Sequence, residues 1–142
     1  MEPLARVVAS ATHALDPRFM GIAPAFAIPK ALRRAGLTPE QIDVWEIHEA
    51  YASVAVGILK ELPQQLDGFE VPDERLNPNG GAVAVGHPFG SSGTRYVLTL
   101  ATEPRERGRV MSVVPHQVNR LAIDQPSTAF SSFGNPEITA AA

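Results

Sequence analysis

Apolar residues recur with helical spacing in two stretches of the chain. Over residues 23–37 they return every three or four positions, and Gly36 stands where a helix C-cap is expected. Over residues 50–62 the repeat falls on every fourth residue, at Val54, Ile58 and Leu62. This pattern predicts helices over 23–37 and 50–62, and Pro63 is expected to end the second one.

Other stretches are rich in β-branched residues or in residues that favour turns. Three segments are predicted as strands, namely 5–15, 43–49 and 109–115. The polar segment 63–79 contains three prolines and is predicted as a surface loop. Residues 91–108 are predicted as a helix that Ser91 or Ser92 caps and that Pro104 breaks near its end.

The alternation of helices and strands predicts an α/β fold. We expect one domain over residues 1–109, followed by a divergent segment over 110–142. After Pro115 no apolar period is sustained, so the strand over 109–115 is predicted to be the last regular element and the rest a poorly ordered tail. A frameshift near residue 109 or 110 is one hypothesis for this change, and the gene sequence would test it.

Composition limits the classes of function. A 142-residue chain that is 44% hydrophobic and 19% charged is typical of a globular domain with a real core. The net charge of -3 and the lack of a basic block argue against nucleic-acid binding. No apolar run is long enough to span a membrane or to serve as a secretory signal, so a cytoplasmic location is expected. The chain has no cysteine, which excludes disulfides, thiolate metal sites and a cysteine nucleophile of its own.

The stretch "NPNGGAVAVGHPFGSSGTR", residues 77–95, surrounds one histidine, His87, with five glycines. Glycines such as Gly80, Gly81 and Gly86 permit positive φ and close approach by another segment. A histidine between glycine and proline suits a general base or a hydrogen-bond donor to a developing oxyanion. The alternative is a tight turn whose histidine only caps backbone groups. The spacing does not fit a Walker A phosphate loop.

A second histidine, His48, lies in "EIHEAYA", residues 46–52. The zinc protease motif H-E-x-x-H is not met, because position 52 is alanine. His48 falls at a predicted strand-to-helix junction, where side chains of α/β folds often face a crevice. The alternative is a helix-capping or core histidine.

Taken together, these segments resemble the C-terminal domain of thiolases, the acetyl-CoA and 3-ketoacyl-CoA acyltransferases. The resemblance covers residues 3–109 and rests on "PLARVVASATHALDPRFMGIAPAFAIPKALRRAGL", "DVWEIHEAYA", "LNPNGGAVAVGHPFGSSGTR" and the helix that follows. It implies the C-terminal half of the thiolase fold, a mixed β-sheet covered by helices.

The resemblance also implies roles for individual residues. His87 corresponds to the family histidine that helps to activate a catalytic cysteine and lines an oxyanion hole. His48 takes the place of an asparagine that holds a water in that hole. Met20 and Gly21 match a loop near the acyl pocket, and the glycines around His87, including Gly86 and Gly90, are expected to let substrate approach.

The function that this resemblance implies is that of a fragment of an acyl-CoA C-acyltransferase, which would act in 3-ketoacyl-CoA thiolysis or in Claisen condensation. Its substrates would be coenzyme A thioesters, with no cofactor and no metal. Its partners would be acyl-CoA or CoA and either further copies of the chain or a chain carrying the thiolase N-terminal domain. Both family cysteines are absent here, so no activity is expected of the chain alone.

Two alternatives remain open. The first is an inactive remnant or interaction module that pairs with intact thiolase chains. The second, a histidine-dependent hydrolase, lacks a G-x-S-x-G nucleophile motif. The segment 96–100 is predicted to face the core and so to carry no information on the substrate.

Overall fold

A computed structural model describes residues 4–102, 111–115 and 120–124 of the protein. Its strands are β1 (Arg6–Ala11), β2 (Val44–Trp45), β3 (Met111–Pro115) and β4 (Arg120–Asp124). Its α-helices are α1 (Ala23–Ala35), α2 (Ala52–Gln65), α3 (Ala82–Val85) and α4 (Ser92–Thr102). Short 3-10 helices are η1 (Pro17–Ile22), η2 (Pro39–Gln41) and η3 (Asp73–Arg75).

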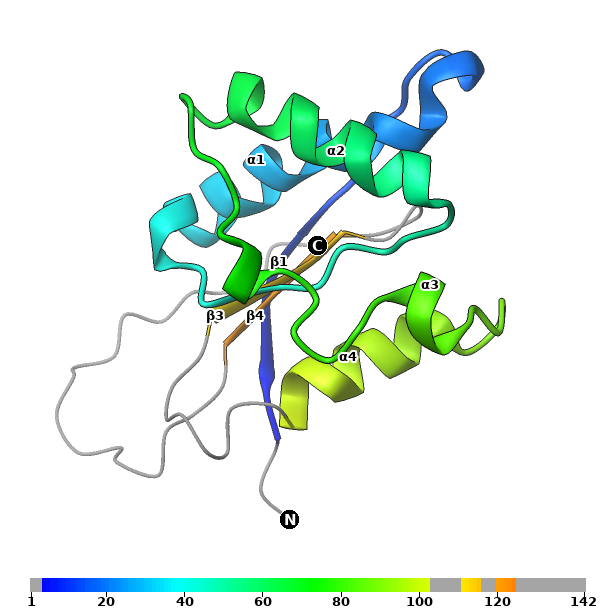
Figure 1. The fold of residues 1–142 in the computed structure, drawn as a ribbon. Coiled ribbons are helices and arrows are strands. Elements are labelled where there is room, and N and C mark those ends of the chain that lie inside the picture. The colour runs from blue at the N-terminus through cyan, green and yellow to red at the C-terminus, as the bar shows by residue number, and fades with distance from the viewer. Residues whose placement is uncertain (1–3, 103–110, 116–119, 125–142) are drawn as a thin grey trace, which may run out of the picture.

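The four strands form one mixed sheet in the order β1-β4-β3-β2. β4 pairs antiparallel with both β1 and β3, whereas β2 pairs parallel with β3. Figure 1 shows α1 and α2 together on one side of the strands and α4 on the other. The predicted α/β fold, a mixed sheet covered by helices, is confirmed.

Two apolar clusters cover the two sides of β2. Successive residues of a strand point to opposite faces, and Val44 and Trp45 accordingly belong to different clusters. Trp45 packs in the larger cluster with residues of α1 and α2, and Val44 packs with Tyr96 and Leu100 of α4. The end of β2 is therefore held between the two helical layers. This packing also fixes the position of the segment that follows β2.

The first half of the chain follows the predicted order with shifted boundaries. The predicted strand 5–15 is shorter and ends at Ala11. Asp16 then accepts a hydrogen bond from the backbone N–H of Arg18 and so begins η1. Helix α1 ends with Gly36 at φ +66°, in the left-handed conformation that the sequence predicts for it.

The prediction that Pro63 ends the second helix is wrong. Helix α2 runs from Ala52 through Pro63 to Gln65. A proline inside a helix removes one hydrogen bond and costs about 3 kcal/mol. Leu62 and Leu66 on either side are both buried in the core, and burying one leucine contributes about 1.5–3 kcal/mol. Tertiary burial on both sides of Pro63 thus offsets the local penalty.

Regular elements also occur where none is predicted. The expected loop 63–79 contains η3 and the end of α2, and α3 lies inside the glycine run. The segment after Pro115 contains β4, so the prediction of no regular element there is wrong for residues 120–124. Strand β4 lies between β1 and β3, and this central position in the sheet is a tertiary feature that a short apolar run does not reveal.

The remaining predictions concern the third helix and the tail. The backbone carbonyl of Ser91 accepts the first hydrogen bond of α4, from the N–H of Arg95, so Ser91 is the capping residue. Residues 103–110, with the predicted break at Pro104, lie outside the described residues, as do 116–119 and 125–142. The domain division at 109/110 stays a prediction.

Candidate functional site

The segment after β2 is buried although two of its side chains are ionisable. Glu46, Ile47 and His48 are each no more than 2% exposed. The amide side chain of Asn77 binds the backbone on both sides of Ile47: its Oδ1 accepts from the Ile47 N–H at 2.7 Å, and its Nδ2 donates to the Ile47 carbonyl at 3.0 Å. The Asn77 backbone N–H donates to the Trp45 carbonyl at 2.8 Å. Asn77 thus takes the place of a neighbouring strand and keeps this buried segment extended.

Glu49 ties the same segment to the glycine run. Its Oε1 accepts from Asn77 Nδ2 at 3.0 Å, and its Oε2 accepts from the Val83 N–H, in the first turn of α3, at 2.9 Å. A Cβ atom on Gly81 would overlap the Glu49 carboxylate, so a larger residue there would displace this side chain from its hydrogen bonds. Gly80 and Gly86, at φ +82° and +87°, adopt the backbone conformation that favours glycine. The glycines therefore let this loop pass close to Glu49 and turn toward His87.

His87 lies directly after Gly86, on the loop between α3 and α4. Its Nδ1 is 2.7 Å from the Ser92 hydroxyl oxygen. Ser92 is fully buried, and its hydroxyl donates to the Pro88 carbonyl at 3.1 Å. The loop is held further by Arg95, whose Nη1 donates to the Gly86 carbonyl at 2.8 Å. Ser92 and Arg95, both on α4, thus hold the exposed imidazole of His87 in place.

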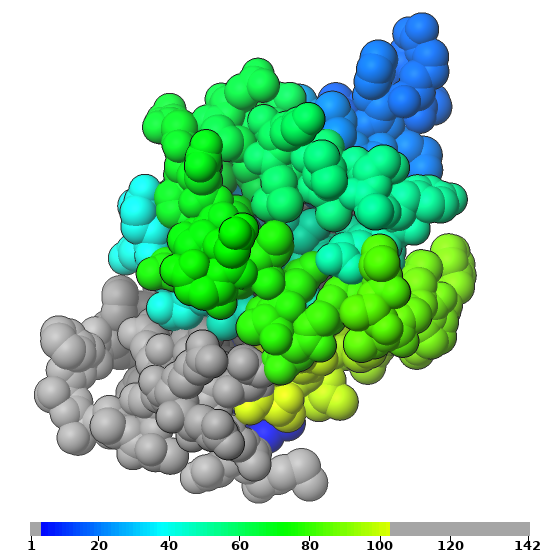
Figure 2. Space-filling view, in the orientation of Figure 1, coloured from blue at the N-terminus to red at the C-terminus, as the bar shows by residue number. Residues whose placement is uncertain are grey.

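His48 meets His87 at this point. The two ring centroids are 4.4 Å apart and the ring planes are inclined by 54°. Nδ1 of His48 lies 2.7 Å from the hydroxyl of Tyr96, which is one helical turn after Ser92 on α4. One helix face therefore holds both imidazoles by their Nδ1 atoms, the buried His48 and the exposed His87 (we call them the histidine pair). Figure 2 shows α3 and the start of α4 at the surface beside the beginning of α2.

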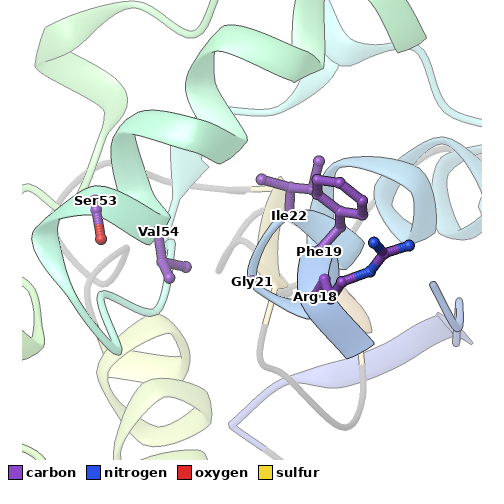
Figure 3. Close-up of a pocket in the computed structure, with 6 residues that line it drawn as sticks. All are labelled: Arg18, Phe19, Gly21, Ile22, Ser53 and Val54. Carbon is purple, nitrogen blue, oxygen red and sulfur yellow. The ribbon is translucent and has the colours of Figure 1, made fainter. Parts of the chain in front are cut away.

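The other predicted site residues fall in two places, η1 and the loop around His87. Met20 and Gly21 belong to η1; Met20 is 58% exposed, and Gly21 packs closely against Val54 of α2. A shallow pocket of about 170 Å³ opens between η1 and the first turn of α2. Figure 3 shows Ser53 and Val54 of α2 on one side of it and the residues of η1 on the other. Gly90 lies in open space on the loop after His87. Substrate contacts at Met20, Gly21, Gly86 and Gly90 stay predictions.

The residues that hold the histidine pair were not predicted from the sequence. Tyr96 was assigned to the core without a role, and its ring is indeed buried, but its hydroxyl binds His48. A signal was present: Ser92 and Tyr96 are four residues apart in a predicted helix, so their hydroxyls share one face. For Asn77 the sequence offers no comparable signal, since its partners lie about thirty residues away.

Burial raises the pKa of the Tyr96 phenol above its usual 10.0, and the neighbouring Arg95 guanidinium lowers it by less. The Arg95 guanidinium also lies over the Tyr96 ring, 4.9 Å from its centroid. The phenol therefore stays protonated at neutral pH and can donate its proton.

This shift predicts a loss of stability in alkali. The folded protein binds the Tyr96 proton more tightly than the unfolded chain, so the contribution is complete below pH 10 and disappears as pH rises through the folded-state pKa. We expect the free energy of unfolding, measured by urea denaturation, to fall as the pH rises above about 10, and to fall less in Tyr96→Phe. Equal pH slopes for the two proteins would contradict this assignment.

The arrangement suits acid–base chemistry and oxyanion binding, but it contains no nucleophile. Ser92 is the hydroxyl nearest to His87, but no G-x-S-x-G motif surrounds it, which argues against a serine hydrolase. Within residues 4–102, 111–115 and 120–124, no group of three His, Cys, Asp or Glu side chains is placed to hold a metal ion. In the same part of the chain, no helix has the length and apolar character needed to cross a membrane.

Known proteins are similar to this chain in sequence and in fold. A family profile described as "Thiolase, C-terminal domain" matches residues 1–117. The chain is 45% identical over 104 residues to the beta-ketoadipyl-CoA thiolase of Acinetobacter baylyi, and 50% identical over 95 residues to the peroxisomal 3-ketoacyl-CoA thiolase B of Mus musculus. These matches cover 73% and 67% of this chain, but only 25% and 21% of the two relatives. The solved acetyl-CoA acetyltransferase of Bacillus anthracis superimposes with a TM-score of 0.75 and 32% identity, over 88% of this chain and 31% of that one.

Proposed function

Because the chain belongs to the thiolase family and matches its C-terminal domain, we propose that it supplies the histidine half of an active site for acyl-CoA thioesters. The chain spans about a quarter of the length of the curated relatives it matches. It contains no cysteine, so the nucleophilic thiol of such a site has to come from a separate segment or chain.

The histidine pair is the observation that supports this proposal. A thioester reaction needs a base for the attacking thiol and a donor for the carbonyl oxygen that becomes negative. Two imidazoles with centroids 4.4 Å apart can provide both functions at one reaction centre. Their fixed Nδ1 contacts point to the opposite ring nitrogen, Nε2, as the reacting atom of each.

In the proposed reaction, Nε2 of His87 removes the proton from a cysteine thiol of the N-terminal domain. The thiolate attacks the thioester carbonyl, and the charge on the carbonyl oxygen is stabilised by a hydrogen bond from His48. When the tetrahedral intermediate collapses, the bond between the acyl carbon and the CoA sulfur breaks. His87 returns the proton to that sulfur, so acyl-cysteine and free CoA are the products.

The surface beside His87 supports a covering partner. Phe89 is 91% exposed, and its ring lies 6.0 Å from the His87 ring. Val83 and Val85 of α3 are also exposed by more than half. Apolar side chains clustered beside a polar site are typical of a surface that another domain covers. We infer that this partner is a thiolase N-terminal domain. It would belong to another chain or to another subunit of a larger assembly.

The test is CoA release in a mixture of this chain with the cysteine-bearing N-terminal part of a thiolase. With acetyl-CoA as substrate, we expect one equivalent of CoA per cysteine, detected with a thiol reagent, and acetylation of that cysteine by mass spectrometry. Neither component alone should release CoA at this rate. Release by this chain alone would contradict the proposal, because the chain has no thiol to accept the acyl group.

The absence of cysteine also favours a second candidate, a non-catalytic module that pairs with thiolase chains. The same mixture distinguishes the two functions. A stable complex, measured by size-exclusion chromatography, that releases no CoA would support the module and exclude the half-site.

A further inference from the structure

Arg95 lies in the first turn of α4, and its side chain reaches back to the loop that carries His87. Side chains of a helix lean toward its N-terminus, so an arginine at this position is directed to the residues that precede the helix. Its Nη1 donates to the Gly86 carbonyl at 2.8 Å. Gly86 is the residue immediately before His87. One side chain thus joins α4 to the start of the loop 86–91.

This loop has a backbone with much conformational freedom. Its residues are all exposed, Gly86 has φ +87°, and a Cβ atom on Gly90 would meet nothing within 4 Å. Glycine changes its backbone angles at low cost, so the loop needs an external contact to keep one conformation. The peptide group that joins Gly86 to His87 is planar. A hydrogen bond that holds the Gly86 carbonyl therefore also fixes the direction in which the chain enters His87.

The same guanidinium lies against the residue that holds His48. The Cζ atom of Arg95 is 4.9 Å from the centroid of the Tyr96 ring, and the Tyr96 hydroxyl is 2.7 Å from Nδ1 of His48. Adjacent residues of a helix do not face each other, so Arg95 has to fold over its neighbour to make this contact. A cation above an aromatic ring is attracted by its electrons. Arg95 therefore contacts the supports of both histidines.

The guanidinium contributes little to the stability of the fold as a whole. Its Nη2 is buried and makes no hydrogen bond within the part of the chain that the structure describes, an arrangement that disfavours folding. Gly86 is exposed, so water can bind its carbonyl when the arginine is absent. A methionine would fill the same space over the Tyr96 ring. These compensations act whether or not the loop is ordered, whereas the bond to Gly86 exists only in the ordered loop.

We propose that Arg95 is a positioning residue of the histidine pair, which fixes the peptide group before His87 and supports the Tyr96 ring. The proposal rests on the proposed function, because the rate that it concerns is that of CoA release. A guanidinium stays protonated at neutral pH, so Arg95 itself exchanges no proton. It acts by keeping His87 in one place, and a misplacement of about 1 Å can slow a reaction about a hundredfold.

The first test is ¹⁵N relaxation NMR on the 142-residue chain without any partner. We expect the His87 amide to have an order parameter of about 0.85, typical of rigid backbone, and to fall toward about 0.6 in Arg95→Met. Arg75→Met is the matched control: Arg75 is also half-buried and donates to two backbone carbonyls, those of Glu40 and Ile42, away from the histidine pair. A mobile His87 amide in the wild type, or equal values in wild type and Arg95→Met, would overturn the proposal.

The second test is the single-turnover rate of CoA release in the reconstituted mixture. Arg95→Met is expected to slow it about tenfold to a hundredfold, with the half-saturating acetyl-CoA concentration and the urea midpoint unchanged. Arg95→Lys keeps a charged donor for the Gly86 carbonyl, so its rate is expected to lie between those of Arg95→Met and the wild type. A rate that falls only in proportion to the folded fraction, or no recovery in Arg95→Lys, would contradict a positioning role.

The wild-type order parameter tests the proposal even where a variant does not fold. The two tests also separate this proposal from the proposed function. A rigid His87 amide that loosens in Arg95→Met, with no CoA release from any mixture, would contradict the proposed function and leave the anchoring of the loop intact. CoA release at the same rate in wild type and Arg95→Met would overturn the role of Arg95 and leave the proposed function intact.

Discussion

Replacing His87 by alanine is expected to slow CoA release in the reconstituted mixture by about a hundredfold to ten-thousandfold. This is the usual contribution of a general acid–base group. The variant removes the imidazole that would take the thiol proton and return it to CoA. It leaves Ser92 buried against the Pro88 carbonyl, so the start of α4 is preserved. The measurement is the single-turnover rate of CoA release at saturating acetyl-CoA.

His13→Ala is the matched control for this variant. His13 is a partly buried histidine that stacks on Phe26 with ring centroids 5.2 Å apart, outside the histidine pair. Its replacement is expected to leave the rate of CoA release unchanged once the fraction of folded protein is taken into account. If His87→Ala and His13→Ala gave the same rate, His87 would have no role in proton transfer.

Asn77→Ala is expected to destabilise the protein by about 3 kcal/mol. Leaving a buried hydrogen-bonding group without its partner costs about 1–3 kcal/mol, and Asn77 serves three groups: the Ile47 N–H, the Ile47 carbonyl and the Glu49 carboxylate. Ile47 is fully buried, so water cannot readily replace these bonds. Urea denaturation measures the change in the free energy of unfolding.

The same variant connects stability with the site. Asn77 keeps residues 46–49 extended, and His48 is in that segment. Asn77→Ala is therefore also expected to shift the NMR signals of the His48 ring. Gln64→Ala, an exposed position on α2, is the control and should change the free energy of unfolding by less than about 0.5 kcal/mol. A loss of stability as small as that of the control would mean that Asn77 does not hold this segment.

The part of the fold that depends on local pattern could be predicted from the sequence. The helical repeat before Gly36 marks α1, and the repeat of Val54, Ile58 and Leu62 marks α2. Both helix predictions are correct because a helix buries one face. The apolar residues on that face are only three or four positions apart in the sequence. The prediction at Pro63 failed because a local penalty was weighed without the burial of Leu62 and Leu66.

The candidate site also contains a part that could be predicted from the sequence and a part that could not. His48 and His87 were identified from the residues around them and from the family resemblance, and the structure brings their rings together. The close approach of Glu49 to Gly81, the hydrogen bonds of Asn77, and the pairing of Tyr96 with His48 were not predicted. Each joins residues that are roughly thirty to fifty positions apart.

By itself, then, the sequence determined the α/β class, the two main helices and the histidines to consider. Periodicity and glycine placement express constraints that act within a few residues. Only the tertiary structure decided that β4 lies inside the sheet, that Asn77 supports the His48 segment, and that Ser92 and Tyr96 hold the two rings. A hydrogen bond between distant residues depends on distance and direction in space, and folding alone brings those two groups within reach of each other.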